Sequence, residues 1–155
     1  MPSLLRLLTL GTMLALGAVS ATGALAADKE QVLKDREALM KEQGHQWLAI
    51  RSYLQDKADQ AAALAATASL SKSLPTVPNF FPPGSEGANP DGKYAPKPEV
   101  WSKHDEFLAA DKKVGDQVAA LDAAIKSGDK VKAAAAFADL KFCAACHDTF
   151  RAKLQ

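Results

Sequence analysis

The placement of proline divides this sequence into two halves that both favour helices. Seven of the eight prolines lie between Pro75 and Pro98, and the eighth is Pro2. The flanking segments are rich in Ala, Leu, Lys, Asp and Glu, most of which are good helix formers. Runs of alternating β-branched residues, which would indicate strands, are absent. The sequence therefore predicts an all-α chain with two helices, a proline-rich connection, two further helices and no strands.

Capping signals and apolar periodicity place the first two helices. Asp28 followed by Gln31 resembles a capping box that opens helix one. Its inward-facing positions then recur at spacings of three, four or seven residues, which is the helical period. They are Leu33, Arg36, Met40, Trp47, Ile50 and Leu54. Asp56 can cap helix two, whose alanine-rich body runs from Ala58 to Leu74 and stops at Pro75.

Similar signals place the last two helices. Pro98 suits the first turn of helix three, and Ser127-Gly128 ends it. Asp129 caps helix four, which we expect to run nearly to Gln155. Two short connections and one long one between four amphipathic helices predict an antiparallel four-helix bundle rather than a looser helical array. We expect the aromatic residues of the long Pro-rich connection between helices two and three to pin it onto the bundle: Phe80, Phe81 and Tyr94.

The N-terminus has the layout of a secretory signal peptide. Arg6 precedes an apolar run, and small residues follow up to Ala26. An uncleaved membrane anchor is the alternative, but the run is short and rich in Gly and Ala. We expect residues 1–26 to be removed and residues 27–155 to form one periplasmic domain without a membrane span. Removing Arg6 from the 19 Lys and Arg leaves 18 against 18 Asp and Glu, so we expect no nucleic-acid partner.

The only two cysteines of the chain, Cys143 and Cys146, directly precede His147 in the motif CAACH. A disulfide between residues one turn apart would close a very small loop and stabilise little. A thioredoxin-type redox pair belongs in a βαβ context, which the sequence lacks. Zinc would need a fourth ligand from His45 or His104, and the adjacent Cys146 and His147 chelate awkwardly.

The pattern C-x-x-C-H is the attachment signature of a c-type haem. Two thiols one helical turn apart can each add to a vinyl group of one porphyrin, and the adjacent histidine can donate a ring nitrogen to the iron. The sequence therefore predicts one covalent haem c, held by Cys143 and Cys146 with His147 as an iron ligand. A stripe with helical spacing indicates that His147 points into the bundle: Phe137, Leu140, Ala144, His147 and Arg151. Arg151 lies either near a haem propionate or in solvent.

This C-terminal motif, followed by DTFR, resembles that of the cytochrome c′ family, the class II c-type cytochromes. The resemblance extends along the chain through DREALMKEQG in helix one, FPPGSEG in the connection, and PEVW with Phe107 in helix three. It implies a left-handed antiparallel bundle with one covalent haem and His147 as the proximal iron ligand. Because many members of the family are homodimers packed through their first two helices, a homodimer is possible here.

On the opposite, distal face, the chain resembles the low-spin branch of the family. Met40 lies four residues after Arg36 in the context Leu39-Met40-Lys41, where high-spin members have an aliphatic residue. The resemblance implies that Met40 is the second iron ligand and that Arg36 binds a haem propionate. A thioether suits haem iron and raises its potential; the alternative is that Met40 only fills the core. We expect the competing ligands, His45 and His104, to be surface or rim residues.

Three classes of function were compared. Axial ligands from His147 and Met40 would leave no open iron position, so we expect a periplasmic single-electron carrier with redox protein partners. The alternative is a five-coordinate haem protein that binds nitric oxide or carbon monoxide. A peroxidase would need a distal acid–base pair beside an open iron, and the sequence shows no such pair. We therefore expect no catalytic residues and no enzyme.

Overall fold

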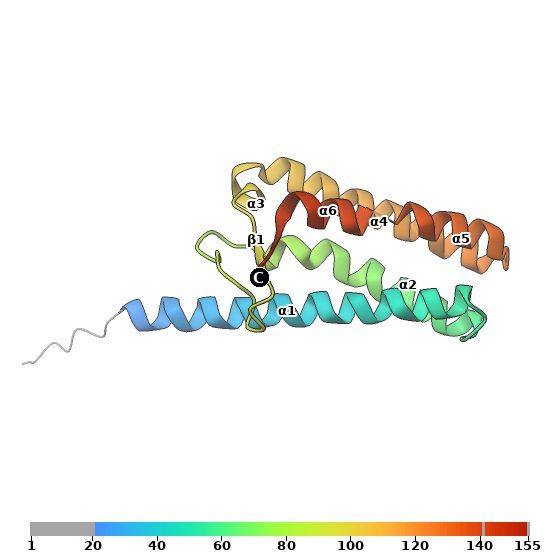
Figure 1. Ribbon diagram of the computed structural model, residues 1–155, viewed down its shortest axis with the longest axis horizontal. Coiled ribbons are helices and arrows are strands. Elements are labelled where there is room, and N and C mark those ends of the chain that lie inside the picture. The colour runs from blue at the N-terminus through green and yellow to red at the C-terminus, as the bar shows by residue number, and fades with distance from the viewer. Residues whose placement is uncertain (1–20, 141, 155) are drawn as a thin grey trace, which may run out of the picture.

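The computed structural model describes residues 21–140 and 142–154, so most of the expected signal peptide lies outside the described residues. The expected cleavage position, after Ala26, falls within helix α1 (Ala21–Leu54). The first turns of α1 project beyond the other helices (Figure 1). Among the described helices, none is long and apolar enough to cross a membrane. The division into a signal peptide and a single domain stays a prediction.

Four helical arms run alternately in opposite directions along the molecule (Figure 1). The first is α1, and the second is α2 (Gln60–Ser73). The third is α4 (His104–Lys126), and the fourth consists of α5 (Lys130–Asp139) and α6 (Phe142–Phe150). Helix α1 packs against α2, α2 against α4, and α4 against both α5 and α6. This arrangement confirms the predicted antiparallel four-helix bundle.

The long connection is more structured than the sequence predicted. It begins with the 3₁₀ helix η1 (Leu74–Phe80), which continues through two prolines, and later contains strand β1 (Tyr94–Pro96). β1 pairs antiparallel with β2 (Arg151–Lys153), which follows α6 directly. The expectation of no strands is therefore wrong. Three-residue strands are too short to leave an alternating pattern in the sequence, and their pairing depends on tertiary contacts between distant segments.

The starts of the first two arms differ from the prediction. Asp28 lies inside α1 instead of capping it, and the Gln31 amide donates a hydrogen bond to Asp35 one turn later (2.8 Å). Asp59, not Asp56, caps α2, and its carboxylate accepts a hydrogen bond from the Ala62 backbone N–H (2.8 Å). Asp56 instead takes a left-handed backbone conformation with φ of 59° in the turn before it. Both carboxylates suit a turn, so the sequence alone did not discriminate between them.

The third and fourth arms were each predicted as one continuous helix, and each is broken once. Lys103, whose backbone is not helical (φ −123°, ψ 46°), separates the short helix α3 (Glu99–Ser102) from α4. In the fourth arm, which Asp129 caps as expected, a tight turn at Leu140 ends α5. The amide of the Gln117 side chain donates to the Asp139 carbonyl there (3.1 Å) and so satisfies a helix-end acceptor. The CAACH motif therefore lies on its own helix, and that helix ends at Phe150 rather than near Gln155.

The buried side chains form two clusters. The larger one joins α1, α2, α4 and α5, and consists of Ile50, Tyr53, Ala63, Ala66, Leu70, Leu74, Val114, Val118, Leu121, Ile125, Ala133 and Leu140. The smaller one lies at the connection and contains Val77, Val100, Phe107 and Phe150. Cys143 packs against the larger cluster, whereas Cys146 packs against the smaller one. The CAACH helix therefore spans the boundary between them.

Candidate functional site

A cavity of about 350 Å³ lies beside the smaller cluster. Its volume falls within the range of about 300–1,000 Å³ that is usual for cofactor and small-molecule pockets. Its walls come from α1, η1, the connection, α4, α6 and β2. The lining residues are Arg36, Glu37, Met40, Lys41, Val77, Phe81, Asn89, Asp91, Lys93, Tyr94, Ala95, Pro96, Val100, Phe107, Cys146, His147, Phe150 and Arg151.

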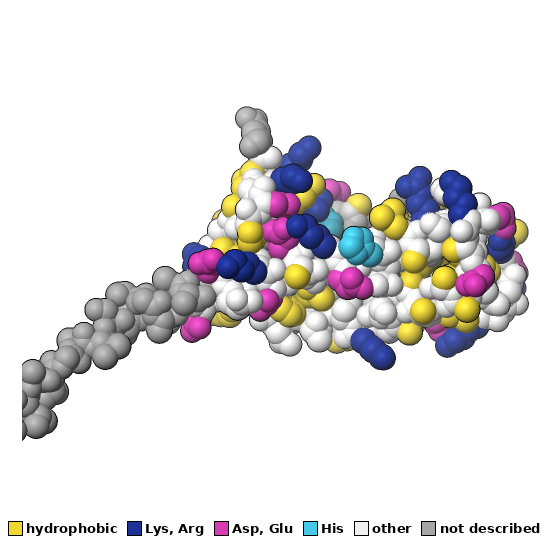
Figure 2. All heavy atoms as spheres, turned by 90° about the horizontal axis from the view of Figure 1, so that it is seen from below, with side chains coloured by type: hydrophobic (Ala, Val, Ile, Leu, Met, Phe, Trp, Pro, Cys, Tyr) yellow, Lys and Arg dark blue, Asp and Glu magenta, His cyan; other side chains and the backbone are white. Residues whose placement is uncertain are grey.

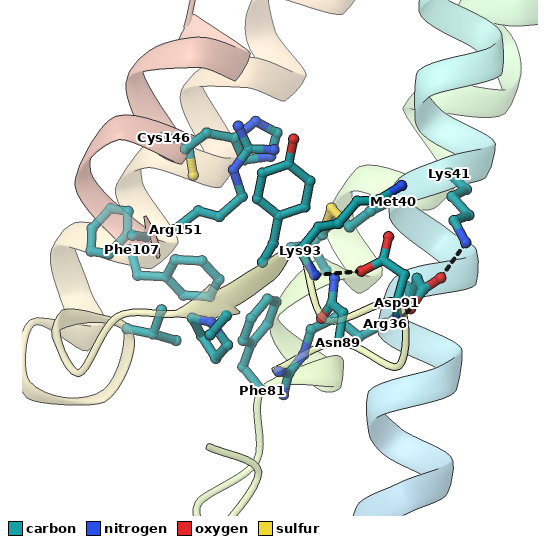
Figure 3. A pocket seen from close by; sticks show the side chains of 18 residues that line it. Arg36, Met40, Lys41, Phe81, Asn89, Asp91, Lys93, Phe107, Cys146 and Arg151 are labelled. Atoms are coloured by element: carbon teal, nitrogen blue, oxygen red, sulfur yellow. Dashed lines mark hydrogen bonds and ion pairs between the residues drawn. The ribbon is translucent and has the colours of Figure 1, made fainter. Parts of the chain in front are cut away.

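The cavity brings together four of the five site residues predicted from the sequence. Met40 and Arg36 line it from α1, and Cys146 and His147 line it from α6. Figure 3 shows Met40 and Cys146 coming from opposite sides. The fifth residue, Cys143, is half-buried against the larger cluster and does not line the cavity. The two faces of the predicted haem pocket, one with His147 and one with Met40, thus lie on different helices that the fold places across one cavity.

The His147 imidazole is held in its neutral form. Burial is the main cause that lowers its pKa to about 4, and the positive charge of Arg151 lowers the pKa further, against a smaller opposing effect of Asp148. A neutral imidazole keeps a nitrogen lone pair available at pH 7, which a metal ligand needs. The electrostatics of the cavity therefore suit His147 as an iron ligand.

Both cysteine thiols are free and half-buried in the structure. Burial raises the pKa of Cys143, and burial together with the nearby Asp111 and Cys143 raises the pKa of Cys146 to about 11. Redox-active cysteines have lowered pKa values that favour the thiolate. The surroundings of these thiols therefore argue against a thioredoxin-type pair. Among the described residues, no group of three or more His, Cys, Asp or Glu is arranged to hold a metal ion, so the zinc alternative has no candidate site there.

Arg36 is 2% exposed and makes three hydrogen bonds to the connection. Its Nε donates to the Phe80 carbonyl (2.9 Å), and its Nη2 donates to the carbonyl (2.9 Å) and the hydroxyl (2.8 Å) of Ser85. The guanidinium lies 4.3 Å from the centre of the Phe81 ring. Burial lowers the pKa of Arg36 to about 10, while Glu86 raises it, so the side chain remains charged at pH 7.

The remaining nitrogen of that guanidinium, Nη1, is buried without a hydrogen-bond partner. A buried donor without a partner is costly, and a carboxylate is the group that suits a guanidinium best. Because Arg36 lines the cavity, this unpaired donor fits a cofactor that brings a carboxylate. The thiol of Cys146, the neutral imidazole of His147 and the thioether of Met40 complete a donor set that fits a haem.

The two competing histidines lie outside the cavity lining. The His45 side chain is 74% exposed, and its Nδ1 lies 3.8 Å from the Glu42 carboxylate. His104 is exposed at the start of α4, where its Nδ1 lies 3.4 Å from the Val100 carbonyl. Their placement agrees with the expectation that both are surface or rim residues.

Several lining residues were not predicted as part of a site. Phe107 makes edge-to-face contacts with Phe81 (5.2 Å between ring centres) and with Phe150 (5.3 Å), so three aromatic rings form one apolar wall. The exposed Arg151 lies over the Tyr94 ring at 4.2 Å and lines the cavity. Aromatic residues in both segments were visible in the sequence. Nothing in the sequence indicated that Glu37 and Asp91 would meet at this cavity.

A four-helix bundle that presents C-x-x-C-H on its last arm beside a cavity is the arrangement of a c-type haem protein. A family model described as Cytochrome C′ matches residues 31–151. Cytochrome c′ of Pararhodospirillum photometricum is 33% identical over 130 residues, covering 81% of this chain and 99% of that protein. Cytochrome c-556 of Agrobacterium tumefaciens (strain II Chrys) is 33% identical over 126 residues, which cover 78% of this chain and 97% of that protein. This chain belongs to the cytochrome c′ family, whose members carry one covalently attached haem c.

Solved structures agree with this membership. The nitric oxide complex of a leucine-to-alanine variant of cytochrome c prime from Alcaligenes xylosoxidans superposes with a TM-score of 0.70 at 28% identity. The alignment covers 81% of this chain and 97% of that one. Cytochrome c′ from Rubrivivax gelatinosus superposes with a TM-score of 0.64 at 30% identity. That alignment covers 76% of this chain and 91% of the other. The low-spin branch that the sequence suggested is not distinguished by these likenesses, because relatives named cytochrome c′ and cytochrome c-556 both match.

Proposed function

We propose that this chain is a mono-haem c-type cytochrome that binds nitric oxide or carbon monoxide on the haem face covered by Met40. The cavity carries the proposal, because it places His147 on one side and a flexible thioether on the other. The likeness to a cytochrome c prime structure described as a nitric oxide complex supports gas binding more than the electron-carrier function expected first. When bound, the haem iron supplies a redox centre and a position for a diatomic ligand.

The chain's own residues would hold the cofactor as follows. Cys143 and Cys146 supply the two thioether links, and His147 supplies a neutral imidazole as the proximal ligand. Arg36 offers its unpaired Nη1 to a propionate. The rings of Phe81, Phe107 and Phe150 give the cavity one apolar wall, against which the flat face of a porphyrin would pack.

Met40 decides how open the distal face is. Methionine is unbranched and has three rotatable bonds, so its side chain can move within a cavity at small cost. With a haem bound, its sulfur would be a soft ligand able to compete with a gas molecule for the iron. Gas binding on this face therefore requires the Met40 sulfur to yield that position.

Electron transfer with axial ligands from His147 and Met40 is the second candidate. One observation favours it: Met40 lines the cavity, and Met1 and Met13 lie in the expected signal peptide. The relative named cytochrome c-556 is a second cytochrome of this fold that matches the chain over most of its length. The two candidates differ in whether the Met40 sulfur leaves the iron.

An optical titration separates the two candidates. The purified ferrous holoprotein is titrated with carbon monoxide while its visible spectrum is recorded. The proposal expects a saturable spectral change. Sharp α and β bands that carbon monoxide does not alter would instead establish the electron carrier. The Met40→Leu variant is the positive control, because it should bind carbon monoxide in either case.

The remaining parts of the proposal concern place and partners. We propose a periplasmic protein released by cleavage after Ala26, with a homodimer packed through α1 and α2.

The face on the α1 side carries Lys and Arg side chains interspersed with Asp and Glu (Figure 2). This mixture favours small, transient contacts with redox proteins over one strongly charged partner. We propose that the chain has no catalytic residue.

A further inference from the structure

The acidic side chain of Glu37 is buried beside the cavity. Glu37 is 8% exposed and directly follows the buried Arg36 in α1. A buried carboxylate is costly unless it is paired and hydrogen-bonded. The partners of Glu37 therefore indicate what this residue does in the fold.

Glu37 uses both carboxylate oxygens. Oε1 accepts a hydrogen bond from the ammonium of Lys41, one turn later in α1, and the two form an ion pair (Figure 3). Oε2 accepts a hydrogen bond from the backbone N–H of Asp91 in the connection (3.1 Å). The hydrogen bond with Glu37 is the main cause that raises the pKa of Lys41, and the charge of Asp91 adds to it. Glu37 thus joins α1 to a segment more than fifty residues away in the chain.

That segment, residues 89–93, is a compact turn with its own hydrogen bonds. The Asn89 N–H donates to the Tyr94 carbonyl (2.7 Å), and the Gly92 N–H donates to the Asn89 carbonyl (2.8 Å). Gly92 has a φ of 68°, which favours glycine. The Lys93 N–H donates to the Asp91 carboxylate (3.0 Å). These bonds hold the turn together as one unit, and the Lys93 carbonyl also accepts a hydrogen bond from the Leu154 N–H (2.8 Å).

The turn forms part of the cavity wall that faces solvent, beside the exposed Lys41 and Arg151. Asn89, Asp91 and Lys93 line the cavity, and Asp91 and Lys93 are also exposed. Its far end is fixed because Tyr94 begins β1, which pairs with β2. In the described part of the chain, the bond from Asp91 to Glu37 is the hydrogen bond that joins the turn to α1.

We propose that Glu37 is a positioning residue that holds the turn 89–93 against α1 as the outer wall of the cavity, and so sets how fast small molecules reach Met40. The inference rests on the proposed function, since it concerns access to the distal face. Asn89, Asp91 and Lys93 of the turn line the same cavity as Met40, so the closed turn forms part of the wall around that side chain. Without the Glu37 carboxylate, the turn would remain joined to the fold through β1 and would open more often.

Hydrogen exchange of the holoprotein tests the first part of this inference. The variants are Glu37→Ala, which removes both bonds, and Glu37→Gln, which keeps an oxygen acceptor and removes the ion pair. The control is Glu30→Ala, which breaks the equivalent exposed pair with Lys34 (2.6 Å) on the same helix. Loss of a charged hydrogen bond should speed exchange in the peptide covering residues 89–93 by about tenfold in Glu37→Ala. Glu37→Gln should show a smaller increase and Glu30→Ala none. Unchanged exchange in Glu37→Ala would overturn the inference.

Two access measurements test the second part. Carbon monoxide should associate several times faster with ferrous Glu37→Ala than with the wild type after flash photolysis. Peroxide should also convert Met40 to its sulfoxide faster, as measured by mass spectrometry. Faster exchange with unchanged rates in both measurements would show that the turn is no barrier, and would overturn the access role. If the wild type binds no carbon monoxide, the proposed function fails. The rates of hydrogen exchange and of Met40 oxidation still decide the role of Glu37.

Discussion

Met40 and His147 line the same cavity from different arms of the bundle, Met40 on α1 and His147 on α6. The cavity between them is also lined by the aromatic wall and by the turn 89–93. Both side chains are half-buried. His147 lies on a short helix that continues directly into β2, whereas Met40 is unbranched and has three rotatable bonds. We therefore expect ligand exchange on the Met40 side of the cavity.

The first prediction concerns Met40→Leu. The two side chains have similar volumes, so we expect the variant to fold at a cost below about 1.5 kcal/mol. Because no thioether competes for the distal position, carbon monoxide should bind more tightly than to the wild type. If the wild-type iron is bound by Met40, the variant should also change from a low-spin to a high-spin spectrum and fall in potential. Leu39→Met is the control. An unchanged spectrum and unchanged gas affinity in Met40→Leu would show that Met40 only packs.

The second prediction concerns covalent attachment. Cys143→Ser and Cys146→Ser should each remove one thioether link, and the double variant should lose its haem on a denaturing gel stained for haem. The chain has no other cysteine, so any stain that remains in a single variant reports the other link. Cys143 lies outside the cavity lining, so the comparison also shows whether both thiols reach the cofactor. A wild-type protein without a haem-staining band would contradict the assignment.

The third prediction concerns the stability of the connection. Arg36→Gln should remove the charged hydrogen bonds to Phe80 and Ser85 and leave buried acceptors unpaired. We expect the free energy of unfolding to fall by about 2–4 kcal/mol, given that each charged bond contributes about 1.5–3 kcal/mol. Arg51→Gln changes an exposed residue on the same helix, so its free energy of unfolding should stay within about 0.5 kcal/mol of the wild-type value. Denaturant titration of both variants measures the difference, and equal values would contradict a structural role for Arg36.

The fourth prediction concerns pH. Burial raises the pKa of Asp111, which lies near Cys146, from 3.8 to about 6. Between these values the folded protein binds more protons than the unfolded chain, so stability falls as the pH rises from about 4 to about 6. Asp111→Asn should remove this dependence. The variant should therefore match the wild type at pH 4 and be more stable at pH 8, by about 1–2 kcal/mol.

Urea titrations at pH 4, 5, 6 and 8 measure this difference. Asp116→Asn is the matched control, because Asp116 is exposed on the same helix and pairs with Lys112 (2.7 Å). If the free energy of unfolding depended on pH in the same way for Asp111→Asn and for the wild type, the burial of the Asp111 carboxyl would be contradicted.

The bundle and the attachment motif were predictable because their signals are local. Proline marks the ends of the helical halves, and Asp129 with Gly128 marks the start of the fourth arm. The breaks at Lys103 and Leu140 could not be predicted in this way, because neither position carries a proline or a glycine. At Leu140 the break depends on a side chain from another helix, Gln117, which binds the carbonyl of Asp139.

The candidate site was predictable to the same extent. His147 follows from the C-x-x-C-H motif, and the apolar pattern places Met40 and Arg36 on the inward face of the first arm. The roles of Met40 and Arg36 toward a haem came from the family resemblance. The outer wall of the cavity, formed by the turn 89–93, could not be predicted from the apolar pattern or from the motif. Glu37 lies on a polar-looking stretch of α1, and its bond to Asp91 depends on the path of a connection with little periodicity. Long-range pairs of this kind leave no pattern in a single sequence.

The anchoring of the connection has a consequence for how chains of this family can differ in length. Arg36 holds the chain at Ser85, Glu37 holds it at Asp91, and β2 holds it from Tyr94 onward. An insertion between Ser85 and Asn89 would lengthen an exposed segment and leave every anchor in place. One extra residue between Asp91 and Tyr94 would instead shift the register of β1 and turn each of its side chains to the opposite face. Natural length variation should therefore be concentrated in residues 86–88, and the stretch from 89 to 96 should keep a constant number of residues.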